Sequence, residues 1–183
     1  MMQSPIDFTL PITGRRVFLH GDVDEGTIGL AIRGMYALSD LDESAIELYV
    51  SSYGGDLDEA FALHDVTRTI GVPVHTVALG KCMSAAPLLV ACGKKGERYG
   101  TENCSFMLHD AILYPSPDSA ANLTAHAKVT ESMVRRYAEL LERYTVKDAR
   151  HWRRIFASKT DRFFGAEQAL DWGLIDTIWS EKD

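Results

Sequence analysis

Three strand-like segments, each followed by a helix-like segment, are the feature that most limits the possible folds of this chain. The strands are expected at residues 15–20, 46–51 and 73–79, and the helices at 24–38, 57–70 and about 84–93. Strands that alternate with helices in this way usually lie parallel in one sheet, because a parallel crossover needs a long connection. The sequence therefore predicts an α/β fold with a largely parallel sheet.

The whole chain is expected to form one domain. Its 183 residues suit a single sizeable core and contain no repeats, low-complexity segments or interdomain linkers. We expect residues 1–14 to be a short N-terminal extension and residues 15–183 to be the domain. The remaining expected elements are a basic turn and short strand over 94–100, a strand over 105–109, helices over 119–144, 146–156 and 166–172, and a last strand over 174–179. Residues 112–117 hold two prolines and are expected as an edge strand or loop.

Charge and cysteine content argue against several classes of function. The net charge of −7 disfavours nucleic acid or an anionic membrane as the main partner. Cys82, Cys92 and Cys104 are odd in number and form no Cys-x-x-Cys pair, which indicates reduced thiols in a cytoplasm-like compartment. Residues 1–13 lack the basic region and apolar core of a signal peptide. The sequence has no metal-ligand motif such as His-Glu-x-x-His, so we expect no metal site.

The third strand-to-helix junction places a serine among small residues. Residues 80–93 read GKCMSAAPLLVACG, with an apolar segment too short to span a bilayer and a terminal glycine that favours a helix stop. Ser84 is expected at or beside the helix N-terminus, where free backbone N–H groups and the positive end of the helix dipole lie. Ser84 is therefore either a cap or packing residue, or a nucleophile beside donors for an oxyanion.

A nucleophilic serine needs a base and a group that orients the base. His109 is the candidate base because it ends an apolar strand; the alternative is a strand-end histidine bonded to a carbonyl. Asp161 lies in a break between helices beside two phenylalanines and is expected to need a partner, whereas Asp110 should point away from His109. The Gly54-Gly55 turn is either merely tight or a place where backbone approaches a substrate carbonyl.

Five stretches of the chain form an ordered set of motifs. They are RVFLHG at 16–21, SYGG at 52–55, GKCMSA at 80–85, FMLH at 106–109, and DRFFGAEQA at 161–169 followed by GLID at 173–176. Together they resemble the Clp protease proteolytic subunit, the ClpP or S14 serine peptidase family, over about residues 15–179. Tyr53 stands where this family usually has proline, and Ala85 stands where it usually has methionine.

The resemblance implies both a fold and a set of residue roles. It implies the ClpP/crotonase-type fold, built of repeated strand-strand-helix units with a protruding long helix. It implies a triad in which Ser84 is the nucleophile, His109 the general base and Asp161 the orienting carboxylate. It also assigns the oxyanion hole to the backbone N–H groups of Gly55 and Ala85.

The resemblance further implies an assembly and partners. The family forms self-compartmentalising rings, usually heptamers stacked in pairs around a chamber, and cleaves unfolded chains that an ATP-driven AAA+ unfoldase delivers. We therefore expect a cytoplasmic homo-oligomer that hydrolyses unfolded polypeptides. No cofactor is expected in this chain, and ATP is expected only through an unfoldase partner.

Two other functions stay open from the sequence. A crotonase-type acyl-CoA enzyme would have the same fold and hold an enolate with paired backbone N–H groups, but it gives Ser84 and His109 no shared role. A catalytically inactive scaffold or ring subunit is the second, although such subunits generally lose a triad residue and all three match here. A Ser-Lys dyad is disfavoured because Lys94 and Lys95 follow the serine helix too closely.

Overall fold

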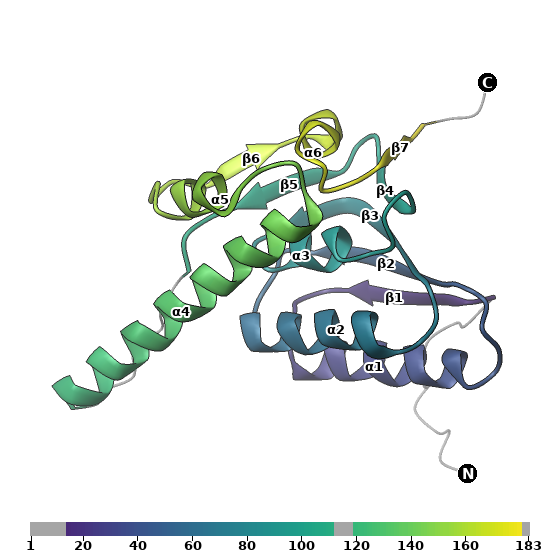
Figure 1. Ribbon diagram of the computed structural model, residues 1–183, viewed down its shortest axis with the longest axis horizontal. Coiled ribbons are helices and arrows are strands. Elements are labelled where there is room, and N and C mark those ends of the chain that lie inside the picture. The colour runs from purple at the N-terminus through teal and green to yellow at the C-terminus, as the bar shows by residue number, and fades with distance from the viewer. Residues whose placement is uncertain (1–13, 112–118, 181–183) are drawn as a thin grey trace, which may run out of the picture.

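The chain forms a mixed α/β fold, which confirms the predicted fold class (Figure 1). The computed structural model describes residues 14–111 and 119–180, so the expected edge strand or loop at 112–117 and nearly all of the N-terminal extension lie outside the described residues. The elements in chain order are β1 (Arg16–His20), α1 (Glu25–Ser39), β2 (Ile46–Ser52), α2 (Leu57–Thr69), β3 (Val74–Met83), α3 (Ala86–Ala91), β4 (Arg98–Thr101), β5 (Ser105–Leu108), α4 (Ala120–Tyr144), α5 (Ala149–Phe156), β6 (Arg162–Phe164), α6 (Ala166–Trp172) and β7 (Thr177–Trp179).

The described strands form one seven-stranded sheet in which β3 is central. Five strands follow the order β1-β2-β3-β4-β7, and all of these neighbours are parallel. The strand β5 also pairs with β3, in parallel, and β6 pairs with β5 in the antiparallel direction. β3 changes neighbour along its length, because residues 76–78 pair with β4 and residues 81–83 pair with β5. This change brings the end of β5 beside the end of β3.

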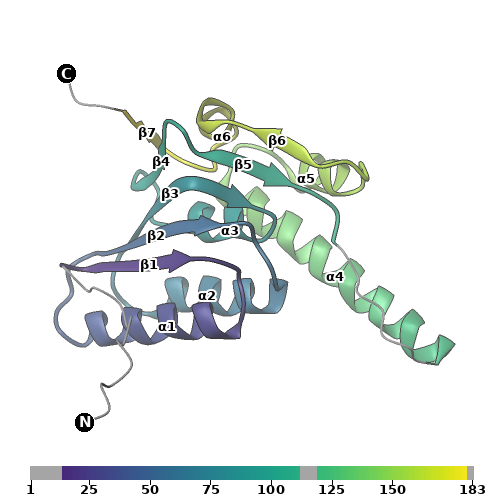
Figure 2. The ribbon, with the colours of Figure 1, turned by 180° about the vertical axis from the view of Figure 1, so that it is seen from behind.

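The hydrophobic core lies between the sheet and the helices packed on it. The strand β2 alternates fully buried and half-buried residues, as a strand with one face on a core should. Helices α1 and α2 lie side by side along β1 and β2, which both ribbon views show (Figures 1 and 2). All six residues of α3 are buried, because a helix that is apolar on every side must lie inside the protein.

Helix α4 projects from the body of the protein, as the protruding long helix was predicted to do (Figure 2). Its 25 residues divide into an exposed outer half and an inner half whose buried residues are Tyr137, Ala138, Leu140 and Leu141. The outer half still carries apolar side chains, with Leu123 40% and Val129 58% exposed. Among the described residues, no helix is both long and apolar enough to cross a bilayer.

Apart from shifts of up to three residues at the ends of other elements, two parts of the fold differ from the expected elements. The third strand was expected to end at residue 79, but β3 continues through Gly80 to Met83, because its last residues gain β5 as a partner. Residues 162–164 were expected to be a break between helices, but they form the short strand β6, which pairs with β5. Both errors concern pairing with β5, which a local sequence pattern does not encode.

A buried ion pair fastens the last part of the chain to the sheet. Arg98 is 1% exposed, and it donates from Nε to Asp176 Oδ2 at 2.7 Å and from Nη2 to Asp176 Oδ1 at 2.6 Å. Burial favours a higher pKa for Asp176, but hydrogen bonds from Arg98 and Lys95 and the Arg98 charge outweigh it and hold the pKa of Asp176 well below its usual range. The ionised pair is therefore part of the folded state at neutral pH.

We expect the Asp176→Asn variant to be less stable by about 3 kcal/mol at neutral pH, because it leaves the Arg98 charge buried without its partner. The pKa of Asp176 is lower in the folded protein than the ordinary carboxyl pKa of about 4. The ionised carboxylate therefore stabilises the folded state fully at pH values above about 4, and this stabilisation is lost as the pH falls toward the lowered pKa. Urea unfolding at about pH 7 and about pH 3 measures the free energy of unfolding of each chain, and the difference in this free energy between the variant and the wild type should be smaller at about pH 3. A difference that is constant with pH, or as small as that of the exposed-site control Asp171→Asn, would contradict this.

Candidate active site

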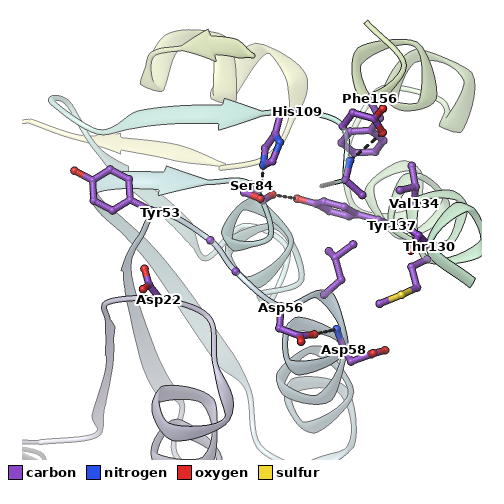
Figure 3. Close-up of a pocket in the computed structure, with 16 residues that line it drawn as sticks. Asp22, Tyr53, Asp56, Asp58, Ser84, His109, Thr130, Val134, Tyr137 and Phe156 are labelled. Atoms are coloured by element: carbon purple, nitrogen blue, oxygen red, sulfur yellow. Dashed lines mark hydrogen bonds between the residues drawn. The ribbon is translucent and has the colours of Figure 1, made fainter. Parts of the chain in front are cut away.

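The pairing of β3 with β5 brings Ser84 and His109 together. Met83 is opposite Met107 in the parallel register, and the Ser84 N–H donates to the Met107 carbonyl at 2.8 Å. His109 follows the last residue of β5, and its Nε2 lies 2.7 Å from Ser84 Oγ, a hydrogen-bond distance (Figure 3). The serine and the histidine that the sequence singled out are therefore in direct contact.

Ser84 has a strained backbone and does not cap the following helix. Its φ angle is 57°, in the left-handed region that residues other than glycine adopt at a cost of about 1–3 kcal/mol. The N-cap of α3 is Ala85, and no side chain bonds there as a cap. The Ser84 hydroxyl bonds instead to His109. This strand-to-helix turn thus holds the hydroxyl out toward the imidazole.

The Gly54-Gly55 turn packs directly against the serine turn. A Cβ atom at Gly54 would overlap with Ser84 Cβ and lie 2.6 Å from the Met83 carbonyl oxygen. A Cβ atom at Gly55 would overlap with the Val23 carbonyl oxygen, and both glycines have positive φ, 97° and 150°. Only glycine fits at these positions, so the closeness of the two turns depends on both residues.

Two backbone donors at these turns have no acceptor among the residues that the structure describes. In the described part of the chain, neither the Gly55 N–H nor the Ala85 N–H bonds to a carbonyl or side-chain oxygen. The neighbouring amides are used, since Gly54 N–H donates to Ser52 Oγ at 2.9 Å and Asp56 N–H donates to the Val23 carbonyl at 2.8 Å. Two free N–H groups beside a serine hydroxyl are the type of donor that stabilises an oxyanion.

Asp161 lies next to His109 along the strands but does not bond to it. The antiparallel register pairs Leu108 with Arg162, so Asp161 and His109 are the next residues along β6 and β5. Asp161 is exposed, and within residues 14–111 and 119–180 neither its carboxylate nor His109 Nδ1 has a hydrogen-bond partner. The short strand β6, which the sequence did not predict, is what places this carboxylate near the imidazole.

Ser84 and His109 open onto a cleft of about 620 Å³. One side is formed by the Gly54-Gly55 turn and the start of α2, and the other by the inner half of α4 (Figure 3). The cleft lining combines carboxylates, apolar groups and neutral hydroxyls: Asp22, Asp56, Asp58, Asp110, Leu57, Met133, Val134, Phe156, Tyr53, Thr130 and Tyr137. The described residues contain no group of three or more His, Cys, Asp and Glu side chains that could hold a metal ion.

Tyr137 makes a contact with the serine turn that the sequence did not predict. It lies on α4, is 4% exposed, and its hydroxyl donates to the Ser84 carbonyl at 2.7 Å. Its ring stacks on Phe156 with the ring centroids 5.1 Å apart. Helical periodicity can place Tyr137 on an apolar face of α4, but it carries no signal for the partner of the tyrosine hydroxyl.

The cysteines are buried thiols rather than rival nucleophiles. Cys82 is two residues before Ser84, and burial raises its pKa well above the usual range. Burial also raises the pKa of Cys92 to about 11 and that of Cys104 to about 12. A thiol that stays protonated is a poor nucleophile, so the hydroxyl of Ser84 is the more reactive group at this turn.

One comparison with known proteins bears on the site. A family model described as Clp protease matches residues 7–182, which is nearly the whole chain. The matched residues include the Gly54-Gly55 turn, the turn that contains Ser84, the end of β5, and the whole of β6.

Proposed function

Because this chain belongs to the Clp protease family, we propose that it is a serine endopeptidase whose nucleophile is Ser84 and whose general base is His109. The observation that supports this most strongly is the 2.7 Å contact between Ser84 Oγ and His109 Nε2. The contact also favours a peptidase over a crotonase-type enzyme, because an enolate held by backbone donors needs no serine paired with a base.

The proposed reaction uses these groups in sequence. With the imidazole proton on Nδ1, His109 Nε2 accepts the proton of the Ser84 hydroxyl as Oγ attacks the peptide carbonyl carbon. The negative oxygen of the tetrahedral intermediate is stabilised by the N–H groups of Gly55 and Ala85. His109 then gives its proton to the leaving amine, and a water molecule activated by the same histidine hydrolyses the acyl-enzyme.

We assign Asp161 as the carboxylate that orients His109 during the reaction. Its place in the register supports this role, because continuing the pairing of β5 and β6 by one residue puts Asp161 opposite His109, and catalytic hydrogen bonds often form only once substrate is bound. We expect Asp161→Ala to lower kcat by about tenfold to a hundredfold, less than the loss for a fully buried triad aspartate. Steady-state hydrolysis of a fluorogenic peptide measures this. An equal or larger loss in Asp110→Ala, the adjacent exposed carboxylate, would contradict the assignment.

The proposed enzyme acts as a homo-oligomeric ring in the cytoplasm, a heptamer that stacks in pairs around a chamber. Family membership supports ring formation, and the apolar side chains on the outer half of α4 support self-association. An aromatic patch on the sheet, made by Phe18, Tyr49, Tyr99 and Trp179, supports docking of an AAA+ unfoldase. The substrates are unfolded polypeptides, and ATP enters only through that partner.

The test is a native mass measurement and a hydrolysis assay on one sample. We expect a mass of seven or fourteen chains, cleavage of short peptides by the ring alone, and cleavage of unfolded casein when an ATP-driven unfoldase is added. A ring that cleaves neither substrate would support an inactive subunit instead. Hydrolysis or hydration of acyl-CoA thioesters without peptide cleavage would support the crotonase-type function.

A further inference from the structure

The carbonyl group of Ser84 is held from outside its own turn. The Ser84 N–H bonds to the Met107 carbonyl at 2.8 Å, and the Ser84 carbonyl accepts from Tyr137 at 2.7 Å, so both backbone polar groups of this residue are fixed. The Tyr137 hydroxyl comes from α4, more than fifty residues away along the chain. Burial raises the pKa of Tyr137 well above its usual range, so the phenol remains a proton donor at neutral pH.

The same peptide unit contains the Ala85 N–H. The described peptide bonds include no cis bond, and in a planar trans peptide the C=O and N–H groups point in opposite directions. A hydrogen bond that fixes the Ser84 carbonyl therefore also fixes the direction of the Ala85 N–H. On that side of the peptide lies the Gly54 turn, since a Cβ atom at Gly54 would be 2.9 Å from Ala85 N.

The restraint acts on a residue that would otherwise relax. Ser84 has a φ of 57°, and a strained backbone persists only when its surroundings hold it there. Rotation of this one peptide unit would change the direction of the Ala85 N–H beside the Gly54 turn while the Ser84 side chain stayed in place. A donor must be aimed at the developing charge before the reaction, because its advantage comes from needing no reorganisation.

We propose that Tyr137 is a positioning residue that aims the Ala85 N–H at the oxyanion through the Ser84 carbonyl. The inference rests on the proposed serine peptidase function and adds a residue outside the triad and the two glycines. Tyr137 does not touch the reacting atoms, so its contribution belongs to the transition state and not to substrate binding.

The test compares Tyr137→Phe with Tyr144→Phe. The phenylalanine ring keeps the stacking on Phe156 and removes only the hydroxyl. Tyr144 is the matched control, because it lies on the same helix and its hydroxyl also makes a hydrogen bond, to His64 Nε2 at 2.8 Å, away from Ser84. For each chain we would measure the kinetics of hydrolysis of a fluorogenic peptide and the free energy of unfolding in urea. We would also measure the affinity for a peptide boronate, whose adduct places an oxygen in the oxyanion hole.

We expect Tyr137→Phe to lower kcat about tenfold to a hundredfold, less than deletion of an oxyanion donor, with KM within about twofold. The affinity of Tyr137→Phe for the boronate should fall by a similar factor, whereas Tyr144→Phe should keep the wild-type kcat and the wild-type boronate affinity. Wild-type kcat in Tyr137→Phe, an equal loss in Tyr144→Phe, or a Tyr137→Phe chain that does not fold would overturn the inference. If the wild-type chain hydrolyses no peptide and binds no boronate, the proposed function itself has failed.

Discussion

Replacement of Ser84 by alanine is expected to abolish peptide hydrolysis, with a loss of about a millionfold or to the level of the background. In the proposed mechanism the Ser84 hydroxyl forms the acyl-enzyme, and among the described residues it is the hydroxyl that His109 Nε2 contacts. Steady-state hydrolysis of a fluorogenic peptide measures the loss. The stability of the variant should stay within about 0.5 kcal/mol of wild type, because the hydroxyl is half-buried and its hydrogen bond within residues 14–111 and 119–180 is the one to the imidazole.

The matched control for this variant is Ser105→Ala, which removes an exposed hydroxyl at the start of the neighbouring strand β5. It should keep wild-type activity. Retention of more than a few per cent of the wild-type rate in Ser84→Ala would contradict the assignment of the nucleophile. Equal losses in both variants would show that β5 was disturbed and that the hydroxyl of Ser84 has no special role.

The second large effect is expected for Gly54→Ala. The added methyl group would overlap with Ser84 Cβ and crowd the Met83 carbonyl, both parts of a turn that is already strained. We expect a loss of kcat of about a thousandfold, because both the hydroxyl and the neighbouring backbone N–H groups proposed as oxyanion donors must shift. We also expect a loss of stability of about 3 kcal/mol, from overpacking and from the positive φ that alanine adopts poorly.

The control variant Gly71→Ala separates the effect of overpacking from the effect of a positive φ. Gly71 has a φ of +84°, close to that of Gly54, but a Cβ atom there would meet nothing within 4 Å. The control should therefore lose about 1 kcal/mol of stability and no activity. If Gly54→Ala behaves like Gly71→Ala in both urea unfolding and peptide hydrolysis, the close packing of the two turns is not what aligns the site.

The alternation of strands and helices was predictable because it rests on local patterns. β2 has a two-residue burial period, and the N-terminus of α1 is capped by Asp24, whose carboxylate accepts from the Thr27 N–H. The sequence also placed Ser84 at the third strand-to-helix junction and His109 at the end of a strand, and the structure puts the two side chains in contact. Local signals were sufficient to single out these two residues as candidates, but their contact depends on the pairing of β3 with β5.

The parts that could not be predicted depend on pairing between distant segments. Strand β6 has only three residues, and its pairing with β5 is what sets the position of Asp161. The strand β3 outlasts its expected end because β5 pairs with its last residues. The role of Tyr137 depends on a hydroxyl that reaches a backbone carbonyl, and a helical stripe of apolar residues contains no information about such a contact.

The most direct test of this account is mapping of the site of fluorophosphonate modification in the wild-type chain and in His109→Ala. The probe reacts with serine hydroxyls that a base has activated, so peptide mass spectrometry should find the adduct on Ser84 in the wild type and almost none in His109→Ala. An adduct on another residue, or equal modification of Ser84 with and without His109, would contradict the account.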